Sequence, residues 1–246
     1  STGIRQNGEL NIGVDEDALL ICSRNLVNVP GFPANQKISN SIYTVPRADL
    51  YTVSPTLTNM SRFENLSLTT HGDYIRPASS IEQSDNKATF LSSGANAITG
   101  ASTGENYIIN VSNVKQFGAT MATPVKIDFD PSKNFTWDFN YGNGATAPLA
   151  RQPHPLGIFI KANSPQVVNN VVDIRGSLWF AHTIRLEWLS GDVSVAVAWY
   201  EVNKDRNELM QGGVITMPST VMFPNAFEWD VYNPSIAVNK YGIVSI

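Results

Sequence analysis

The clearest hydrophobic pattern in the chain lies in residues 177–202. Two long runs of alternating side chains flank a corner at Leu189-Ser190-Gly191. The first run places on one face Leu178, Phe180, Ile184, Leu186 and Trp188, and the second places on one face Val193, Val195, Val197 and Trp199, with Ala196, Ala198 and Tyr200 on its other face. A period of two is typical of β-strands, and a strand that is apolar on both faces is typical of burial between two layers. The pattern therefore predicts a long hairpin in the core of an all-β protein.

A second hairpin is predicted around a turn at Pro131-Ser132-Lys133-Asn134. Val125, Ile127 and Phe129 alternate with charged residues before the turn, and four aromatic residues between Phe135 and Tyr141 alternate with polar residues after it. Shorter strands are expected at residues 42–45, 50–53, 63–70, 106–112, 156–162, 166–174, 213–217, 226–232 and 241–246. Residues 71–105 have the weakest periodicity and are expected to form a long loop or an insertion. Residues 203–211 are expected to form a short helix or an exposed loop.

The sequence predicts one large domain preceded by an extended segment. Residues 1–40 mix polar turns with short apolar runs, and Val29-Pro30-Gly31-Phe32-Pro33 is too rich in Pro and Gly for a central strand. We therefore expect residues 1–40 to form an extended N-terminal arm. Composition does not shift along residues 41–246, which are expected to form a single β-sandwich domain.

The composition of the chain argues against several classes of protein. Charged residues make up 15% of the chain, against roughly 25% in an average soluble domain, so its surface is mostly neutral or partly covered by neighbouring molecules. A net charge of -4 and the lack of a Lys or Arg run argue against binding nucleic acid through its phosphates. The single cysteine, Cys22, excludes an intrachain disulfide and is expected to be a small buried apolar side chain. No apolar run approaches the roughly 20 residues that span a bilayer, so membrane insertion is not expected.

Three groups of carboxylates are candidates for chemistry. Asp15-Glu16-Asp17 could bind calcium, but adjacent strand residues point to opposite faces, so a solvated turn is favoured. Asp128 and Asp130 share a strand face that Asp138 on the partner strand could approach, which allows a shared cation, and the favoured interpretation is a solvent-facing surface. Glu187 and Glu201 lie on the two strands of the long hairpin, which is the arrangement of a β-sandwich glycosidase pair, but Arg185 favours an ion pair or solvent exposure for Glu187.

Histidines and nucleophiles give no catalytic signature. His182 interrupts an apolar face and is interpreted as a core histidine with a backbone hydrogen bond, whereas His71 and His154 fall in predicted loops. Their spacing matches no metal site, and G-x-S-x-G, Walker and Cys/His patterns are absent from the sequence. We therefore assign no catalytic, cofactor-binding or metal-ligating residue and predict that the protein is not an enzyme. Four N-glycosylation sequons, at Asn59, Asn65, Asn110 and Asn134, are expected by chance in this composition.

The last third of the chain resembles a known family. Arg175-Gly176-Ser177-Leu178-Trp179-Phe180, followed by Arg185-Leu186-Glu187-Trp188-Leu189-Ser190-Gly191-Asp192-Val193-Ser194-Val195, resembles a strand–turn–strand passage in the jelly-roll coat proteins of small icosahedral positive-strand RNA viruses, especially picorna-like ones. Met217-Pro218, Phe223-Pro224 and the segment from Asn239 to Ile246 are similar to the closing strands of such subunits. The likeness is one of pattern and covers about the last 75 residues, and the N-terminal half matches only in style, as an extended arm before the barrel.

The resemblance implies an eight-stranded antiparallel jelly roll that assembles with other capsid subunits into an icosahedral virus shell. It further implies a location in the virion, and in the host cytoplasm during assembly, with a host receptor possible. The start at Ser1 would suit cleavage from a polyprotein, and the lack of a basic arm implies that the RNA genome is enclosed with little direct binding. A coat subunit should have long terminal arms without a sheet partner in the same chain.

Two alternatives remain open. A carbohydrate-binding, lectin-like β-sandwich would display aromatics such as Trp137, Trp229 or Tyr232 to stack on sugar rings. A β-sandwich glycosidase would need two carboxylates, Glu187 with Glu201 or Asp138, about 5 to 10 Å apart in an open cleft.

Overall fold

The computed structural model describes residues 5–14, 17–27, 36–80, 86–95, 102–128, 149–151, 159–161, 167, 169–187, 193–216 and 230–246. These form two four-residue helices and seventeen strands, which confirms the all-β class. The helices are α1 (Arg47–Leu50) and α2 (Leu68–His71). The strands are β1 (Arg5–Val14), β2 (Ala18–Val27), β3 (Gln36–Pro46), β4 (Ser61–Leu66), β5 (Asp73–Ser80), β6 (Lys87–Ala95), β7 (Ser102–Ser112), β8 (Thr120–Met121), β9 (Val125–Lys126), β10 (Leu149–Arg151), β11 (Phe159–Lys161), β12 (Val171–Ile174), β13 (Ser177–Glu187), β14 (Val193–Asn203), β15 (Glu208–Ile215), β16 (Ala237–Val238) and β17 (Val244–Ser245).

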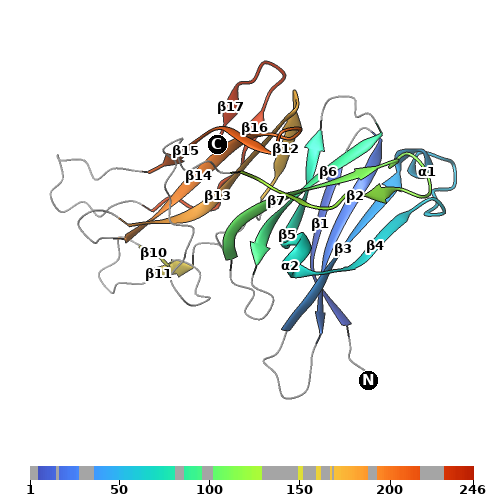
Figure 1. Ribbon diagram of the computed structural model, residues 1–246, viewed down its shortest axis with the longest axis horizontal. Helices are drawn as coiled ribbons and strands as arrows, with labels where there is room; N and C mark the ends of the chain where they lie inside the picture. The colour runs from blue at the N-terminus through green and yellow to red at the C-terminus, as the bar shows by residue number, and fades with distance from the viewer. Residues whose placement is uncertain are drawn as a thin grey trace.

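Most of these strands belong to two large sheets (Figure 1). The first has four strands in the order β1-β2-β3-β4. The second, called here the long sheet, has nine strands in the order β15-β14-β13-β12-β5-β6-β7-β8, with β9 also paired to β7. Within the long sheet β12 and β5 run parallel, which joins its two halves. The hairpins β10-β11 and β16-β17 form two further, two-stranded sheets.

The four-stranded sheet packs face to face on β5–β7, as in a sandwich. Apolar side chains from both sheets form one core between them, with Leu20, Ile42, Phe90 and Ile109 fully buried near its centre. The layers approach closely where Gly13 on β1 meets Pro77 on β5, because a Cβ at Gly13 would lie 2.6 Å from the proline ring. Burial of large aliphatic and aromatic side chains between two layers is the main source of stability in such a fold.

A second core lies on the other face of the long sheet. Leu91 and Ile108 from β6 and β7 share this core with Phe180 and Tyr200 from β13 and β14, so the two halves of the sheet curl around one set of side chains. Backbone hydrogen bonds join the ends of this curl: Asp128 N–H donates to the Asn207 carbonyl at 2.9 Å, and Leu209 N–H donates to the Asp128 carbonyl at 3.3 Å. The segment after β9 thereby meets the start of β15.

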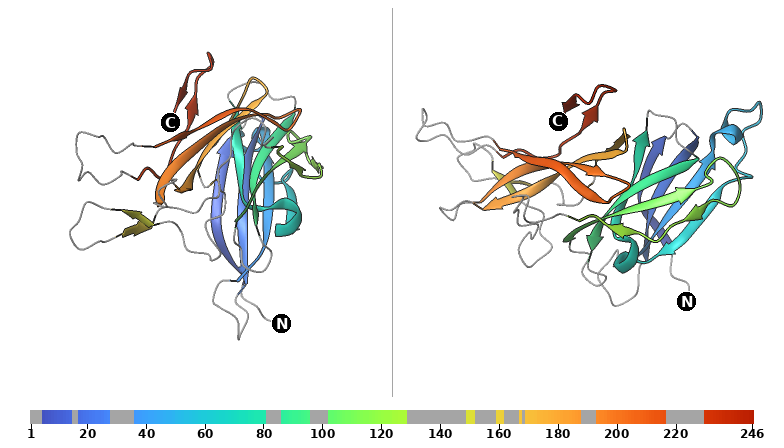
Figure 2. Two further views of the ribbon diagram at one scale, coloured as in Figure 1. Left: turned by 60° about the vertical axis from the view of Figure 1, so that its left-hand side comes forward. Right: turned by 45° about the horizontal axis from the view of Figure 1, so that its top comes forward.

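The C-terminal segment forms a third layer over the outer face of β13 and β14 (Figure 2). Ile236 and Val238 pack there against Trp179, Ala181 and Val197. Both faces of the long hairpin are therefore covered where the structure describes them, as the sequence predicted. Its backbone register runs without a break from the pair of Ser177 with Asn203 to the pair of Glu187 with Val193.

Three predictions about the N-terminal half are wrong. Residues 5–14 and 18–27 pair as β1 and β2 and are not an arm without a partner; adjacent apolar residues such as Leu19 and Leu20 hid the alternation. Residues 71–105, expected as a loop, contain β5, β6 and the start of β7, whose buried faces carry polar residues such as Ser92 and Ser93. Residues 50–53, expected as a strand, end α1 and enter an exposed turn.

Other expectations differ in detail. The number of strands exceeds the eight expected for a jelly roll. Strands that are neighbours in a sheet are mostly also consecutive in the sequence. Residues 203–211 form a turn and the start of β15. Ile127 is buried as expected, but Val125 is exposed. The remainder of that predicted hairpin, the Pro-rich residues 29–33 and the 189–191 corner lie outside the described residues.

Candidate interaction surface

The predicted carboxylate groups do not converge within the described chain. Asp17 binds Lys115, with Oδ1 3.0 Å from Nζ. Asp128 is exposed, and its backbone N–H and carbonyl form hydrogen bonds with Asn207 and Leu209. The partners proposed for them, Asp15, Glu16, Asp130 and Asp138, lie outside the described residues. Among the residues that are described, no three His, Cys, Asp or Glu side chains gather around a possible metal position.

Glu187 and Glu201 are too far apart to act together. Glu187 pairs with Val193 at one end of the long hairpin and Glu201 pairs with Trp179 near the other. The pairs lie eight residues apart along β13, which corresponds to about 26 Å at roughly 3.3 Å per residue. Glu201 instead accepts hydrogen bonds from Ser177 Oγ at 2.8 Å and Gln211 Nε2 at 2.6 Å. The glycosidase pair of Glu187 and Glu201 is therefore excluded, because it requires a separation of about 5 to 10 Å.

His182 is a core histidine, as predicted. Its Nδ1 lies 3.0 Å from the Thr183 carbonyl, and its Nε2 lies 3.2 Å from the Tyr200 hydroxyl. Because a carbonyl can only accept, the proton sits on Nδ1, and Nε2 accepts from Tyr200. Burial lowers the pKa of His182 to about 4, and the hydrogen bond to Thr183 opposes this only in part. At neutral pH the ring is therefore an uncharged part of the core.

The remaining candidate site residues are at least partly buried in the fold or lie outside the described residues. Cys22 is buried, and burial raises the pKa of its thiol. His71 ends α2, where burial lowers its pKa. Tyr232, considered as a sugar platform, is half-buried against Ala150 and Val195. His154, Asn134, Trp137 and Trp229 fall outside the described chain.

The structure points instead to an exposed apolar loop that the sequence did not single out. Residues 51–58, called here the apolar loop, follow α1 and protrude from the end of the four-stranded sheet (Figure 2). Tyr51 is 76% exposed, Leu57 is 57% exposed and Val53 is fully exposed. The loop contains no charged residue. Large apolar side chains gathered on one protruding segment are typical of an interaction site.

The carboxylate of Asp49 braces the apolar loop. Asp49 itself is buried. Its Oδ2 accepts from Asn59 N–H at 3.0 Å and its Oδ1 from Asn59 Nδ2 at 2.9 Å, while its backbone carbonyl accepts from Thr56 N–H at 3.0 Å. These bonds hold the two ends of the loop together. A braced loop loses less conformational entropy when it binds a partner than a free loop does.

The turn at residues 114–118 lies beside the apolar loop and adds Phe117, which is 70% exposed. Ala119 N–H donates to Ser61 Oγ at 3.1 Å, which fixes the turn to β4. Between the turn and α1 is an open pocket of about 330 Å³ that is lined by Asp17, Arg47, Ala48, Tyr51 and Lys115. The Arg47 guanidinium lies over the Tyr51 ring, 4.8 Å from its centroid.

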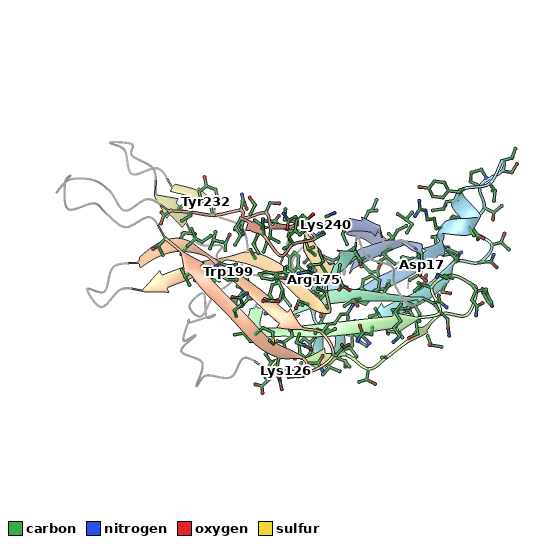
Figure 3. All side chains as sticks on the ribbon, turned by 90° about the horizontal axis from the view of Figure 1, so that it is seen from above. Asp17, Lys126, Arg175, Trp199, Tyr232 and Lys240 are labelled. Atoms are coloured by element: carbon green, nitrogen blue, oxygen red, sulfur yellow. The ribbon has the colours of Figure 1, made fainter. Side chains whose placement is uncertain are left out.

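A second exposed apolar surface lies on the C-terminal hairpin, defined here as residues 237–246. Tyr241, Ile243 and Ile246 are exposed there. Asn239 Oδ1 accepts from the N–H groups of Tyr241 at 2.9 Å and Ile243 at 3.0 Å, and this fixes the turn that displays them. Figure 3 labels Asp17, which lines the pocket beside the apolar loop, and Lys240 on the C-terminal hairpin, and Figure 1 shows α1 and β16 in different halves of the molecule.

Comparison with known proteins adds no assignment. No protein-family model matches the chain, and no curated protein does either. No helix in the described part of the chain is both long and apolar enough to cross a membrane.

Proposed function

We propose that this chain is a structural coat subunit that assembles with copies of itself or with sister subunits into the icosahedral shell of a small, picorna-like RNA virus. The observation that carries the proposal is the pair of separate exposed apolar surfaces, on the apolar loop and on the C-terminal hairpin. A subunit of a shell must contact several neighbours at once, and such contacts need more than one patch of this kind.

Two further features support a role in assembly. Backbone N–H groups donate to the Asp49 carboxylate in one surface and to Asn239 Oδ1 in the other. The conformation of both surfaces is therefore fixed before a partner binds. The low fraction of charged residues leaves much neutral surface for subunit contacts. The resemblance of residues 175–246 to coat-protein strands supports this kind of assembly. The pairing of β1 with β2 means that such contacts would not depend on an N-terminal arm over residues 5–27.

Particle size under native conditions tests the proposal. The purified chain, alone and expressed together with its flanking coding sequence, is examined by electron microscopy and light scattering. We expect closed shells of uniform diameter. A species that remains at the 26.9 kDa monomer mass at every concentration in both preparations would contradict the coat function.

Carbohydrate binding is a second candidate, and the exposed Tyr51 ring favours it. The ring borders the pocket that Asp17, Arg47 and Lys115 line, so an apolar face lies beside polar groups that could bind sugar hydroxyls. Glycan-array binding that Tyr51→Ala abolishes, by a protein that stays monomeric, would favour this function over the coat subunit.

A further inference from the structure

We propose that the apolar loop of one copy of the chain packs against the C-terminal hairpin of a second copy, in a head-to-tail contact. The inference rests on the proposed function, because it names the surfaces through which copies of a coat subunit would meet. The partner that binds each surface is a second copy of the chain and not an unrelated protein, since every copy carries both the apolar loop and the C-terminal hairpin.

The two surfaces match in charge and chemistry. The apolar loop has no charged residue, and the C-terminal hairpin has only Lys240, whose ammonium group lies over the Tyr241 ring, 5.1 Å from its centroid. Val53 and Leu57 on one surface and Tyr241 and Ile243 on the other are all more than half exposed. Burial of uncharged apolar side chains against each other removes them from water without leaving an unpaired charge.

The contact has to be intermolecular. The apolar loop protrudes from the end of the four-stranded sheet, and the C-terminal hairpin stands over β13 and β14 in the other half of the molecule (Figures 1 and 2). Both are anchored: Asp49 braces the loop, and Ile236 and Val238 pack the hairpin segment onto Trp179 and Val197. Neither can reach the other within one copy without breaking these contacts.

Head-to-tail geometry distinguishes this contact from a symmetric dimer. Because the loop of one copy meets a different surface on the next, a pair of copies in contact still has one free loop and one free hairpin. Such heterologous contacts build closed rings or extended arrays, according to the rotation between copies. A ring of subunits around a symmetry axis is the unit that an icosahedral shell requires.

Crosslinking with single cysteines tests the inference. Val53→Cys and Ile243→Cys each place an exposed thiol on one surface, and the native Cys22 does not compete because it is buried. Equal amounts of the two variants are mixed and treated with a short bismaleimide, and the products are separated under denaturing conditions. Asp205→Cys, on the exposed turn between β14 and β15, replaces either partner as a control.

We expect the mixed pair to crosslink at least tenfold more than either variant alone or either control pair. Homodimers of the Val53→Cys variant would show loop-to-loop contact and overturn the inference. Shells that form without the mixed crosslink would also overturn it, while leaving the coat function in place. Rings or oligomers that show the mixed crosslink but never close into shells would support the contact and contradict the coat function. A protein that stays monomeric by mass photometry would overturn both.

Discussion

At the scale of single residues, His182 makes stability depend on pH. The ring is buried between Phe180 and Ile184 on β13 and stacks on Tyr200, with centroids 5.4 Å apart. Its folded-state pKa of about 4 lies below the ordinary value of 6.5, so the unfolded chain binds more protons between these values. Stability is therefore complete above pH 6.5 and falls as the pH drops toward 4. A shift of this size corresponds to about 3 kcal/mol.

The measurement is urea unfolding at pH 7 and pH 4 for the native chain and for His182→Gln. We expect the native protein to lose about 3 kcal/mol more than the variant over this interval, because glutamine does not titrate. The carboxylates contribute to both proteins and cancel in the difference. Equal losses in the two proteins would show that His182 is not held neutral by the fold.

Gly72 is a second residue whose identity the structure explains. Its φ of +71° is in the left-handed region, and a Cβ there would lie 2.7 Å from the Ser93 carbonyl oxygen. Gly72→Ala should therefore cost about 2 to 4 kcal/mol in the free energy of unfolding, from backbone strain and displacement of β6. Gly118 provides the matched control, since its φ is +88° but no atom lies within 4 Å of a Cβ. Gly118→Ala should cost only about 1 kcal/mol, so equal losses would contradict the steric argument.

At the scale of elements, the apolar loop depends on Asp49. Asp49→Ala removes both acceptors for Asn59 and should speed amide hydrogen exchange across residues 51–60 at least tenfold, because the loop ends are no longer held together. Asp49→Asn keeps one carbonyl oxygen and should have an intermediate effect. Exchange in β13 and β14, which are remote from the loop, should not change. Unchanged exchange at residues 51–60 would show that the brace does not control the loop.

Elements were predictable where one face alternates cleanly. The long hairpin was found from sequence because Phe180, Ile184 and Val197 follow a period of two and lie on buried faces. β5, β6 and the start of β7 were missed because the sandwich buries polar residues there, where Ser93 Oγ donates to Asn106 Oδ1 at 3.2 Å and accepts from Val167 N–H at 3.0 Å. Such bonds satisfy buried hydroxyls and amides, but they leave no hydrophobic signal in the sequence.

The two exposed apolar surfaces were harder to predict than the fold. In the sequence, Tyr51 and Val53 alternate with polar residues, which is the pattern of a short strand. In the structure they follow the helical turn α1 (Arg47–Leu50), and their side chains are exposed. A signal that could have indicated the loop is the uncharged, Ser/Thr/Pro-rich composition of residues 52–58 beside Asp49, whose carboxylate accepts from Asn59. Exposure is a property of the folded chain, because it depends on which residues from distant segments cover a side chain.

At the largest scale, the described residues form three layers, and the C-terminal segment is the third. Val231 N–H donates to the Val195 carbonyl at 3.0 Å, Val195 N–H donates to Asp230 Oδ1 at 2.6 Å, and Asn233 N–H donates to Thr183 Oγ1 at 3.2 Å. These bonds position Ile236 over the core that contains Trp179 and Trp199, whose stacked rings have centroids 6.2 Å apart. The segment therefore both covers the long hairpin and carries the C-terminal hairpin.

Because the segment packs on the core through Ile236 and exposes Tyr241, substitutions at these two residues should affect stability and assembly separately. Ile236→Asp places an unpaired carboxylate against the Trp179 core and should lower the unfolding free energy by about 3 kcal/mol, which for a chain of this length lowers the melting temperature by roughly 10 °C. Tyr241→Asp changes a residue that is 70% exposed at the tip of the same hairpin and should leave the melting temperature within about 1 to 2 °C. If the head-to-tail contact exists, Tyr241→Asp should nevertheless abolish oligomers, because it buries a charge against the uncharged apolar loop. Differential scanning calorimetry and mass photometry on the same samples measure both effects. A Tyr241→Asp protein that assembles normally would show that the hairpin stabilises the fold without joining the copies.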